Sequence, residues 1–382
     1  MSLQSSQYSE SSSARTAAIW LLGSLVALCF IIVTLGGYVR LSGSGLAIPE
    51  WPFFTVSQTL DESGKVIASQ KSIFPPTTEE GWEILKAIFV REIPGFEAGI
   101  AMSEFKRMFY IEWGHRAVAK LIGLVYLALM AVTYATPLRS RIGGLVGAGF
   151  VLLILQATLG GIAVWLHLDP VKVSLHLVNA FFFTSVLVWA LLKLVHPSTL
   201  PKATWNPVVT TAWVVYSICI IQLFSGGLMA GSHAGYTMNT WPRMGDQWVA
   251  PGVWDAQQNS YYNFTQNIVF IQFFHRWFAF VVVGAVVYMA LRTAYVEVSK
   301  VGRWALRVAP AIVVLQVILG IFTLLKGVNP HLALTHQSVG LVLLLSVLVV
   351  AYEARFHPVL LEDALAEREE KAKAASREPA HA

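Results

Sequence analysis

Residues 112–116 read EWGHR, and residues 272–276, which lie 160 positions later, read QFFHR. A further histidine follows each stretch, and His176 and His336 are separated by the same shift, since 336 − 176 = 160. The four histidines lie near the starts of long apolar segments, and these are every second such segment in the chain. Neutral imidazole is a strong ligand for haem iron and is otherwise uncommon at membrane depth. The pattern predicts a duplicated membrane protein with one haem-sized site between two histidines in each half.

The composition is that of an integral membrane protein. Of the 382 residues, 55% are hydrophobic and 13% are charged, whereas about 25% of the residues of a soluble chain are charged. Runs of about 20 apolar residues span a bilayer as helices. Eight such runs are present, at 17–39, 117–136, 144–166, 174–195, 208–230, 268–291, 308–326 and 335–354. We therefore predict an all-α integral membrane protein with eight transmembrane helices.

Further matches extend the repeat to other segments. Gly36-Gly37 aligns with Gly226-Gly227 at a shift of 190, and Leu155-Gln156 aligns with Leu315-Gln316 at a shift of 160. The change between the two shifts means that the first long loop is longer than the second, by 190 − 160 = 30. An even number of helices leaves both halves in the same orientation. The expected fold is two tandem four-helix bundles related by a pseudo-twofold internal repeat.

The repeat also sets the expected domain boundaries. The N-terminal half, 17–195, contains the long outer loop 41–108, and the C-terminal half covers 208–354. The segment 1–16 is polar and Ser-rich at its start, lacks the charged start of a signal peptide, and is expected to be a disordered tail. The segment 355–382 is expected to be a polar tail, either helical or disordered.

Lysine and arginine in short loops predict the orientation. The connections after the second, fourth and sixth runs carry several such residues, whereas the loop 167–173 has only Lys172 and the loop 327–334 has none. This bias predicts that both termini lie in the cytoplasm, and we expect the membrane to be a bacterial inner (cytoplasmic) membrane. The four histidines should then lie toward the outer, periplasmic side.

Several other classes fit less well. The two cysteines, Cys29 and Cys219, both lie in apolar runs, so a disulfide framework and a Cys-based metal motif are excluded. The net charge of +5 comes without a basic patch interleaved with aromatics, so membrane lipid is an expected partner and nucleic acid is not. Zinc would require three or four close ligands. Aromatics beside the histidines, such as Trp113 and Phe273, can instead wall a flat macrocycle.

The two halves differ beside their first histidine. Glu112 precedes His115 by one helical turn, and the matching residue of the second half is Gln272, which cannot ionise. Lys120, opposite Phe280, also lies inside an apolar run, where it is either functional or extends toward the interface. This asymmetry places the chemistry in the first half, with Glu112 as its candidate residue, and suggests an electron-transfer haem in the second.

Arg116 and Arg276 each follow a histidine directly. They are candidates for pairing with haem propionates, and the alternative is a purely interfacial position. A di-haem b-type electron-transfer cytochrome explains the four histidines equally well, but it does not require the difference between Glu112 and Gln272. A repeat-built transporter would have broken helices and charges at mid-membrane, and is less favoured.

These features resemble the haem A synthase family over about 20–355. The segments that carry the resemblance are 36–46, 112–116, 156–161, His176, 230–235, 239–244, 275–276 and 336–337. The long first outer loop looks like that of the mitochondrial and alphaproteobacterial branch. Some bacterial relatives carry a cysteine pair in an outer loop, and this chain has none there, which excludes a thiol-based redox step at the outer face.

The resemblance implies an oxidoreductase that converts haem O to haem A for cytochrome oxidase. Two successive hydroxylations would turn the methyl at ring position 8 into a formyl group. By analogy, His115 and His176 flank the substrate haem O, His275 and His336 ligate a permanent haem B, and Glu112 is the catalytic carboxylate. Haem O synthase and cytochrome oxidase assembly factors are candidate partners. The electron donor, the oxygen source and homo-oligomerisation stay open.

Overall fold

The computed structural model describes residues 2–60, 65–93, 99–196, 205, 207–293, 296–297, 300–356 and 359–360. Eight of its helices are long and apolar enough to cross a membrane. They are α1 (Ser2–Leu41), α3 (Met102–Tyr134), α4 (Leu138–Trp165), α5 (Pro170–Val195), α6 (Pro207–Gly231), α8 (Ile268–Thr293), α9 (Lys300–Leu325) and α10 (Pro330–Phe356). The predicted class, an all-α integral membrane protein with eight spanning helices, is confirmed.

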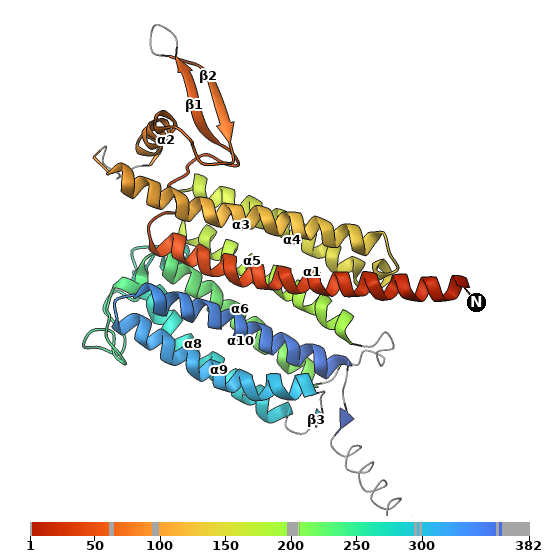
Figure 1. Cartoon of the computed structure of the whole chain (residues 1–382). Coiled ribbons are helices and arrows are strands. Elements are labelled where there is room, and N and C mark those ends of the chain that lie inside the picture. The colour runs from red at the N-terminus through yellow and green to blue at the C-terminus, as the bar shows by residue number, and fades with distance from the viewer. Residues whose placement is uncertain are drawn as a thin grey trace, which may run out of the picture.

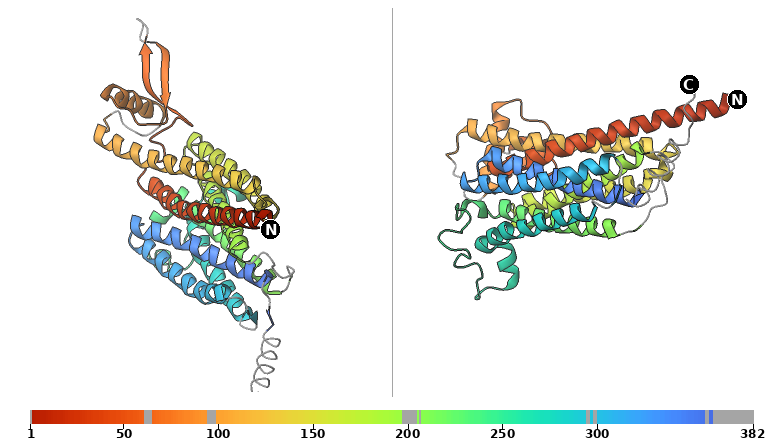
Figure 2. Two further views of the ribbon diagram at one scale, coloured as in Figure 1. Left: turned by 45° about the vertical axis from the view of Figure 1, so that its right-hand side comes forward. Right: turned by 90° about the horizontal axis from the view of Figure 1, so that it is seen from below.

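The long helices run side by side as one elongated bundle (Figures 1 and 2). Helices α1, α3, α4 and α5 pack on one another, as do α6, α8, α9 and α10, and the two groups meet where α1 and α5 contact α6 and α10. Large apolar side chains nevertheless remain exposed on the outside, among them Trp20 at 73% and Leu124 at 66%. An apolar outer surface suits contact with lipid, and the helices leave no backbone N–H or C=O group in need of water there, because these groups bond to one another within each helix.

Helix α3 begins at Met102, fifteen residues before the predicted start at 117. The predicted start was wrong because charged residues, such as Glu104 and Arg107, interrupt the apolar pattern before residue 117. The helix nevertheless includes these residues. These two side chains pair at 2.5 Å over one turn. On the opposite face Phe105 and Phe109 are fully buried. His115 therefore lies well inside the helix rather than near its start.

The extra length of α3 supports a small subdomain formed by the predicted loop 41–108. It contains an antiparallel hairpin, β1 (Phe54–Leu60) and β2 (Val66–Ser72), and the helix α2 (Glu79–Glu92). Trp82 packs edge-on against Phe109 at 5.0 Å and closes the core of this subdomain. Figure 1 shows these elements at one end of the bundle, here called the hairpin end. The end where α1 begins and α10 finishes is called the terminal end.

The remaining elements are short. The second long loop contains the 3-10 turn η1 (Ala234–Tyr236) and helix α7 (Ser260–Thr265). At the terminal end, β3 (Val296–Glu297) pairs with β4 (Val359–Leu360). Strand β4 lies in the segment 355–382, which we expected to be a polar tail. The predicted disordered segment 1–16 also differs from the structure, because α1 begins at Ser2. Extending an existing helix costs far less than nucleating one. Residues 361–382 lie outside the described part of the chain.

Candidate functional site

The four histidines lie on α3, α5, α8 and α10. His176, His275 and His336 come six or seven residues after their helices begin at the hairpin end. All four side chains are partly exposed rather than buried. Each half of the bundle therefore presents two imidazoles, from two of its helices, close to the same end.

Each of these imidazoles packs against a glycine on a neighbouring helix. The pairs are Gly36–His115, Gly160–His176, Gly226–His275 and Gly320–His336, and a Cβ atom added at these glycines would lie 3.3, 3.0, 3.2 and 3.2 Å from the ring. Contacts that short would force the ring to move. The glycines therefore allow each imidazole to lie directly against the neighbouring helix, and any larger residue would change its position.

The second pair has the separation that axial haem ligands require. The ring centroids of His275 and His336 are 6.4 Å apart, with an angle of 81° between the ring planes. Two metal–nitrogen bonds of about 2 Å, with roughly 1.2 Å from each nitrogen to its ring centre, sum to about 6.4 Å. The donor sets and the spacing thus fit a haem held between two imidazoles.

A conventional zinc site is not supported by the described residues. Among them, no group of three or more histidine, cysteine or carboxylate side chains is placed to hold a metal ion. Both cysteines are buried and free, Cys29 in α1 and Cys219 in α6. Two imidazoles without further protein ligands suit a metal whose other positions are filled by a macrocycle.

Glu112 and Arg116 together hold the segment that follows α1. One carboxylate oxygen of Glu112 accepts from Arg116 Nη2 at 2.5 Å, and the other accepts from the backbone N–H of Ile48 at 2.9 Å. Arg116 also donates to Ile48 O at 2.5 Å and to Glu50 O at 2.7 Å. The Glu112 side chain is 4% exposed and that of Arg116 is 12% exposed. The pair is therefore a largely buried clamp, with Glu112 one turn before His115 and Arg116 directly after it.

Gln272 and Arg276 form the corresponding clamp without the charge pair. Gln272 donates to Thr237 O at 2.5 Å and to Ala234 O at 3.2 Å. Arg276 donates to Met238 O at 2.6 Å and to other carbonyls of the same loop. Both predicted propionate partners, Arg116 and Arg276, thus bind loop carbonyls. The Nε atom of Arg276 is buried without a hydrogen-bond partner among the described residues.

The structure identifies further polar groups at the histidines that the sequence did not single out. Ser225 Oγ lies 2.8 Å from His275 Nδ1, and Gln222 Nε2 donates to His275 O at 3.0 Å. In the first half, Gln156 Nε2 lies 3.3 Å from His176 Nε2. The recurrence of Gln156 as Gln316, at the same shift as the histidines, was a usable signal. Ser225 gave no such signal, because the residue 190 positions earlier is Leu35. Lys120 is exposed, away from these contacts.

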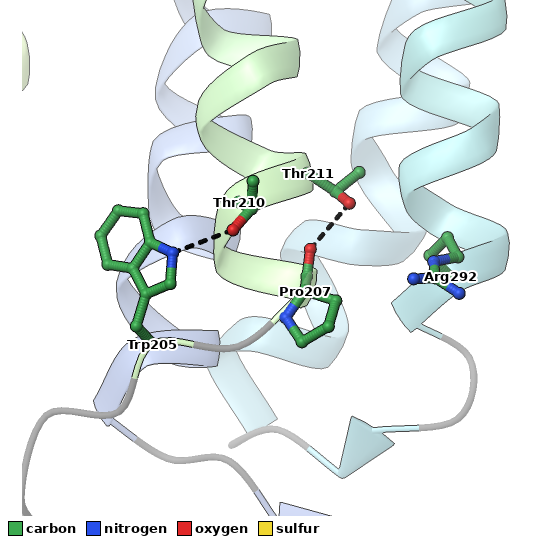
Figure 3. Close-up of a pocket in the computed structure, with 5 residues that line it drawn as sticks. All are labelled: Trp205, Pro207, Thr210, Thr211 and Arg292. Carbon is green, nitrogen blue, oxygen red and sulfur yellow. Dashed lines mark hydrogen bonds between the residues drawn. The ribbon is translucent and has the colours of Figure 1, made fainter.

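Two hollows lie away from the histidines. One, of about 460 Å³, lies near the terminal end and is lined by Trp205, Pro207, Thr210, Thr211 and Arg292 (Figure 3). Trp205 donates to Thr210 Oγ1 at 3.0 Å across it. A second, of about 450 Å³, shares Thr210 and Thr211 and continues between α6 and α8 along mostly apolar side chains. Neither hollow is lined by any of the four histidines.

Comparison with known proteins places most of the membrane region in one family. The model of the cytochrome oxidase assembly protein family (COX15-CtaA) matches residues 18–348. A protein of Rhizorhabdus wittichii named heme A synthase is 32% identical over 343 residues, which cover 87% of this chain and 92% of the relative. Heme A synthases of Nitrosomonas eutropha and Flavobacterium psychrophilum are 32% and 28% identical, over 86% of this chain and 90% and 95% of the relatives. The chain therefore belongs to the cytochrome oxidase assembly protein family.

Proposed function

We propose that this protein is a haem A synthase, an oxidoreductase that converts the C8 methyl of haem O into the formyl group of haem A. Relatives named heme A synthase match this chain over nearly their full length. The observation that supports the activity most directly is the pair of glycine-cradled imidazoles in each half of the bundle. Together with the charged clamp found only in the first half, it favours one reactive and one permanent haem.

His275 and His336 would hold the permanent haem B, and His115 and His176 would hold the substrate haem O. The 6.4 Å separation of the His275 and His336 rings supports the first assignment. The second rests on the matching glycine contacts and on the carboxylate beside His115. When bound, the haem groups supply redox-active iron and, in the first site, the methyl group to be oxidised.

The residues of the first half provide a carboxylate and a clamp. Glu112, buried and paired with Arg116, places a carboxylate one turn from His115. Such a charge stabilises positive charge that develops at the ring edge and offers an acceptor for the protons that are released. Because Arg116 also donates to the carbonyls of Ile48 and Glu50, the clamp ties the subdomain at 41–108 to α3.

The arrangement in the membrane and the repeat are parts of the same proposal. Two tandem bundles, 17–195 and 208–354, would be related by a pseudo-twofold repeat, supported by the equivalent glycine–histidine contacts. The hairpin end would face the periplasm of a bacterial inner membrane, and both termini would face the cytoplasm. Haem O synthase would deliver the substrate, because a farnesylated haem does not diffuse freely through water.

Extraction and chromatography of the haems test this function. The purified protein is compared after expression with and without a haem O synthase. Haem B alone without the synthase, and haem O with haem A in its presence, are expected. Haem B alone in both cases, at two per chain, would identify an electron-transfer cytochrome and contradict the proposed activity.

A further inference from the structure

At His275 the protein engages the Nδ1 nitrogen of the ring. Ser225 Oγ lies 2.8 Å from this atom and donates to Gln222 O at 2.7 Å. Gln222 Nε2 lies 3.3 Å from the same atom, and it donates to the backbone oxygen of His275 at the shorter distance of 3.0 Å. A hydroxyl group has one proton, and a backbone carbonyl can only accept, so the Ser225 oxygen accepts from Nδ1–H of His275. In the neutral ring, this places the lone pair on Nε2. Ser225 therefore orients His275 with its Nε2 free to bind iron.

At His176 the protein engages the opposite nitrogen. Asn179 Nδ2 donates to Leu152 O at 3.0 Å and to Gln156 Oε1 at 2.7 Å. These two bonds fix the orientation of the Gln156 amide, so that its Nε2 faces His176 Nε2 at 3.3 Å. An amide nitrogen only donates. His176 Nε2 therefore accepts through the lone pair that iron would need.

Gln316, the counterpart of Gln156 in the repeat, takes a different position. Its Nε2 donates to the backbone oxygen of His336 at 2.9 Å. Among the described residues, no side-chain hydrogen bond from Gln316 to the His336 ring is found. A Cβ atom at Gly340 would lie 2.8 Å from Gln316 Nε2, and the matching residue of the first half is Ala180. The methyl group of Ala180 closes the equivalent position to Gln156.

A second substitution acts in the same direction. Val339 occupies the position that corresponds to Asn179, so no side-chain amide turns Gln316 toward the ring. Two neighbouring residues thus decide which way the glutamine points. With Asn179 and Ala180 it faces the imidazole nitrogen, and with Val339 and Gly340 it faces the backbone.

We propose that Gln156 is a positioning residue that competes with iron for His176 Nε2, which makes His176 an exchangeable ligand, whereas His275 and His336 are permanent ones. This inference rests on the proposed function, because it takes the first site to hold a haem. One neutral hydrogen bond shifts such a competition by roughly 3- to 10-fold. The asymmetry gives the first site an axial position that can open and keeps the second closed.

Carbon monoxide binding to the purified full-length protein tests the proposal. Haem B is loaded as the probe in both sites, reduced with dithionite and titrated with carbon monoxide, and binding is followed optically. In the unmodified protein, one haem per chain is expected to bind. In Asn179→Val/Ala180→Gly, Gln156 turns to the backbone, and the affinity for carbon monoxide should fall by roughly 3- to 10-fold. The reciprocal variant, Val339→Asn/Gly340→Ala, should make the second haem reactive.

The outcomes separate this inference from the proposed function. Equal carbon monoxide affinity in the unmodified protein and Asn179→Val/Ala180→Gly overturns the role of Gln156. Loss of haem from that variant also overturns it, because tighter ligation is expected. His115→Ala, measured in parallel, should lower the haem content from two per chain to one. Full haem content in His115→Ala would instead contradict the first haem site itself, and with it the proposed function.

Discussion

Replacing Glu112 with glutamine removes the charge from the first clamp and keeps the shape of the side chain. The carboxylate accepts one hydrogen bond from Arg116 and one from Ile48 N. Glutamine has one carbonyl oxygen, so one of these two bonds is lost and an amide group faces the other donor. Glu112→Gln therefore tests the charge while leaving most of the packing of this buried residue in place.

The cost in stability follows from these contacts. A hydrogen bond to a charged group contributes about 1.5–3 kcal/mol, and removing a whole partner from a buried ion pair costs about 3–5 kcal/mol. Arg116 keeps the carbonyls of Ile48 and Glu50. We therefore expect Glu112→Gln to lower the free energy of unfolding by about 1.5–3 kcal/mol. Turnover should fall much further, by about 100-fold, because a preorganised charge near the reacting carbon is lost.

The assay is the ratio of haem A to haem O extracted from cells that also express a haem O synthase. Glu112→Gln should keep both haem sites filled and accumulate haem O. The mirror variant Gln272→Glu serves as the matched control, because it adds a carboxylate at the corresponding position of the second half and should leave the ratio unchanged. An unchanged ratio in Glu112→Gln would refute a role for its charge.

Three further outcomes follow from the structure. In Gly160→Val, a Cβ atom 3.0 Å from His176 displaces the ring, so the first site should lose its haem while the second keeps it, as measured by haem content per chain. In Gly227→Leu, a Cβ atom 2.7 Å from the backbone of α5 should separate the two bundles and cost about 1–3 kcal/mol in thermal unfolding. Partial burial, followed by the Arg40 charge, lowers the pKa of His233 from its ordinary 6.5, so its contribution to stability is present above pH 6.5 and lost as the pH falls. His233→Gln should therefore lose less thermal stability than the unmodified protein between pH 8 and pH 5, and equal losses would contradict this assignment.

The number of membrane-spanning helices and the spacing of the histidines could be predicted directly from the amino-acid sequence. Apolar length is a local property that a bilayer requires of each helix separately, so eight spans follow without knowledge of their neighbours. The common shift that relates His115 to His275 and His176 to His336 is likewise visible in the letters. The start of α3 could not be read in this way, because the first turns around Phe105 are amphipathic and bury their apolar face against the subdomain at 41–108, which lies outside the apolar runs.

The tertiary structure alone decided what surrounds the histidines. Ser225 meets His275, and Arg116 meets Glu50, although each pair is far apart in the sequence. Both arginines, the candidates for pairing with haem propionates, donate to loop carbonyls that α3 and α8 bring within reach. The direction of Gln156 likewise depends on Asn179 on the neighbouring helix. The residues that recur can be read from the amino-acid sequence, whereas the packing of helices distant in the chain decides which atoms those residues meet.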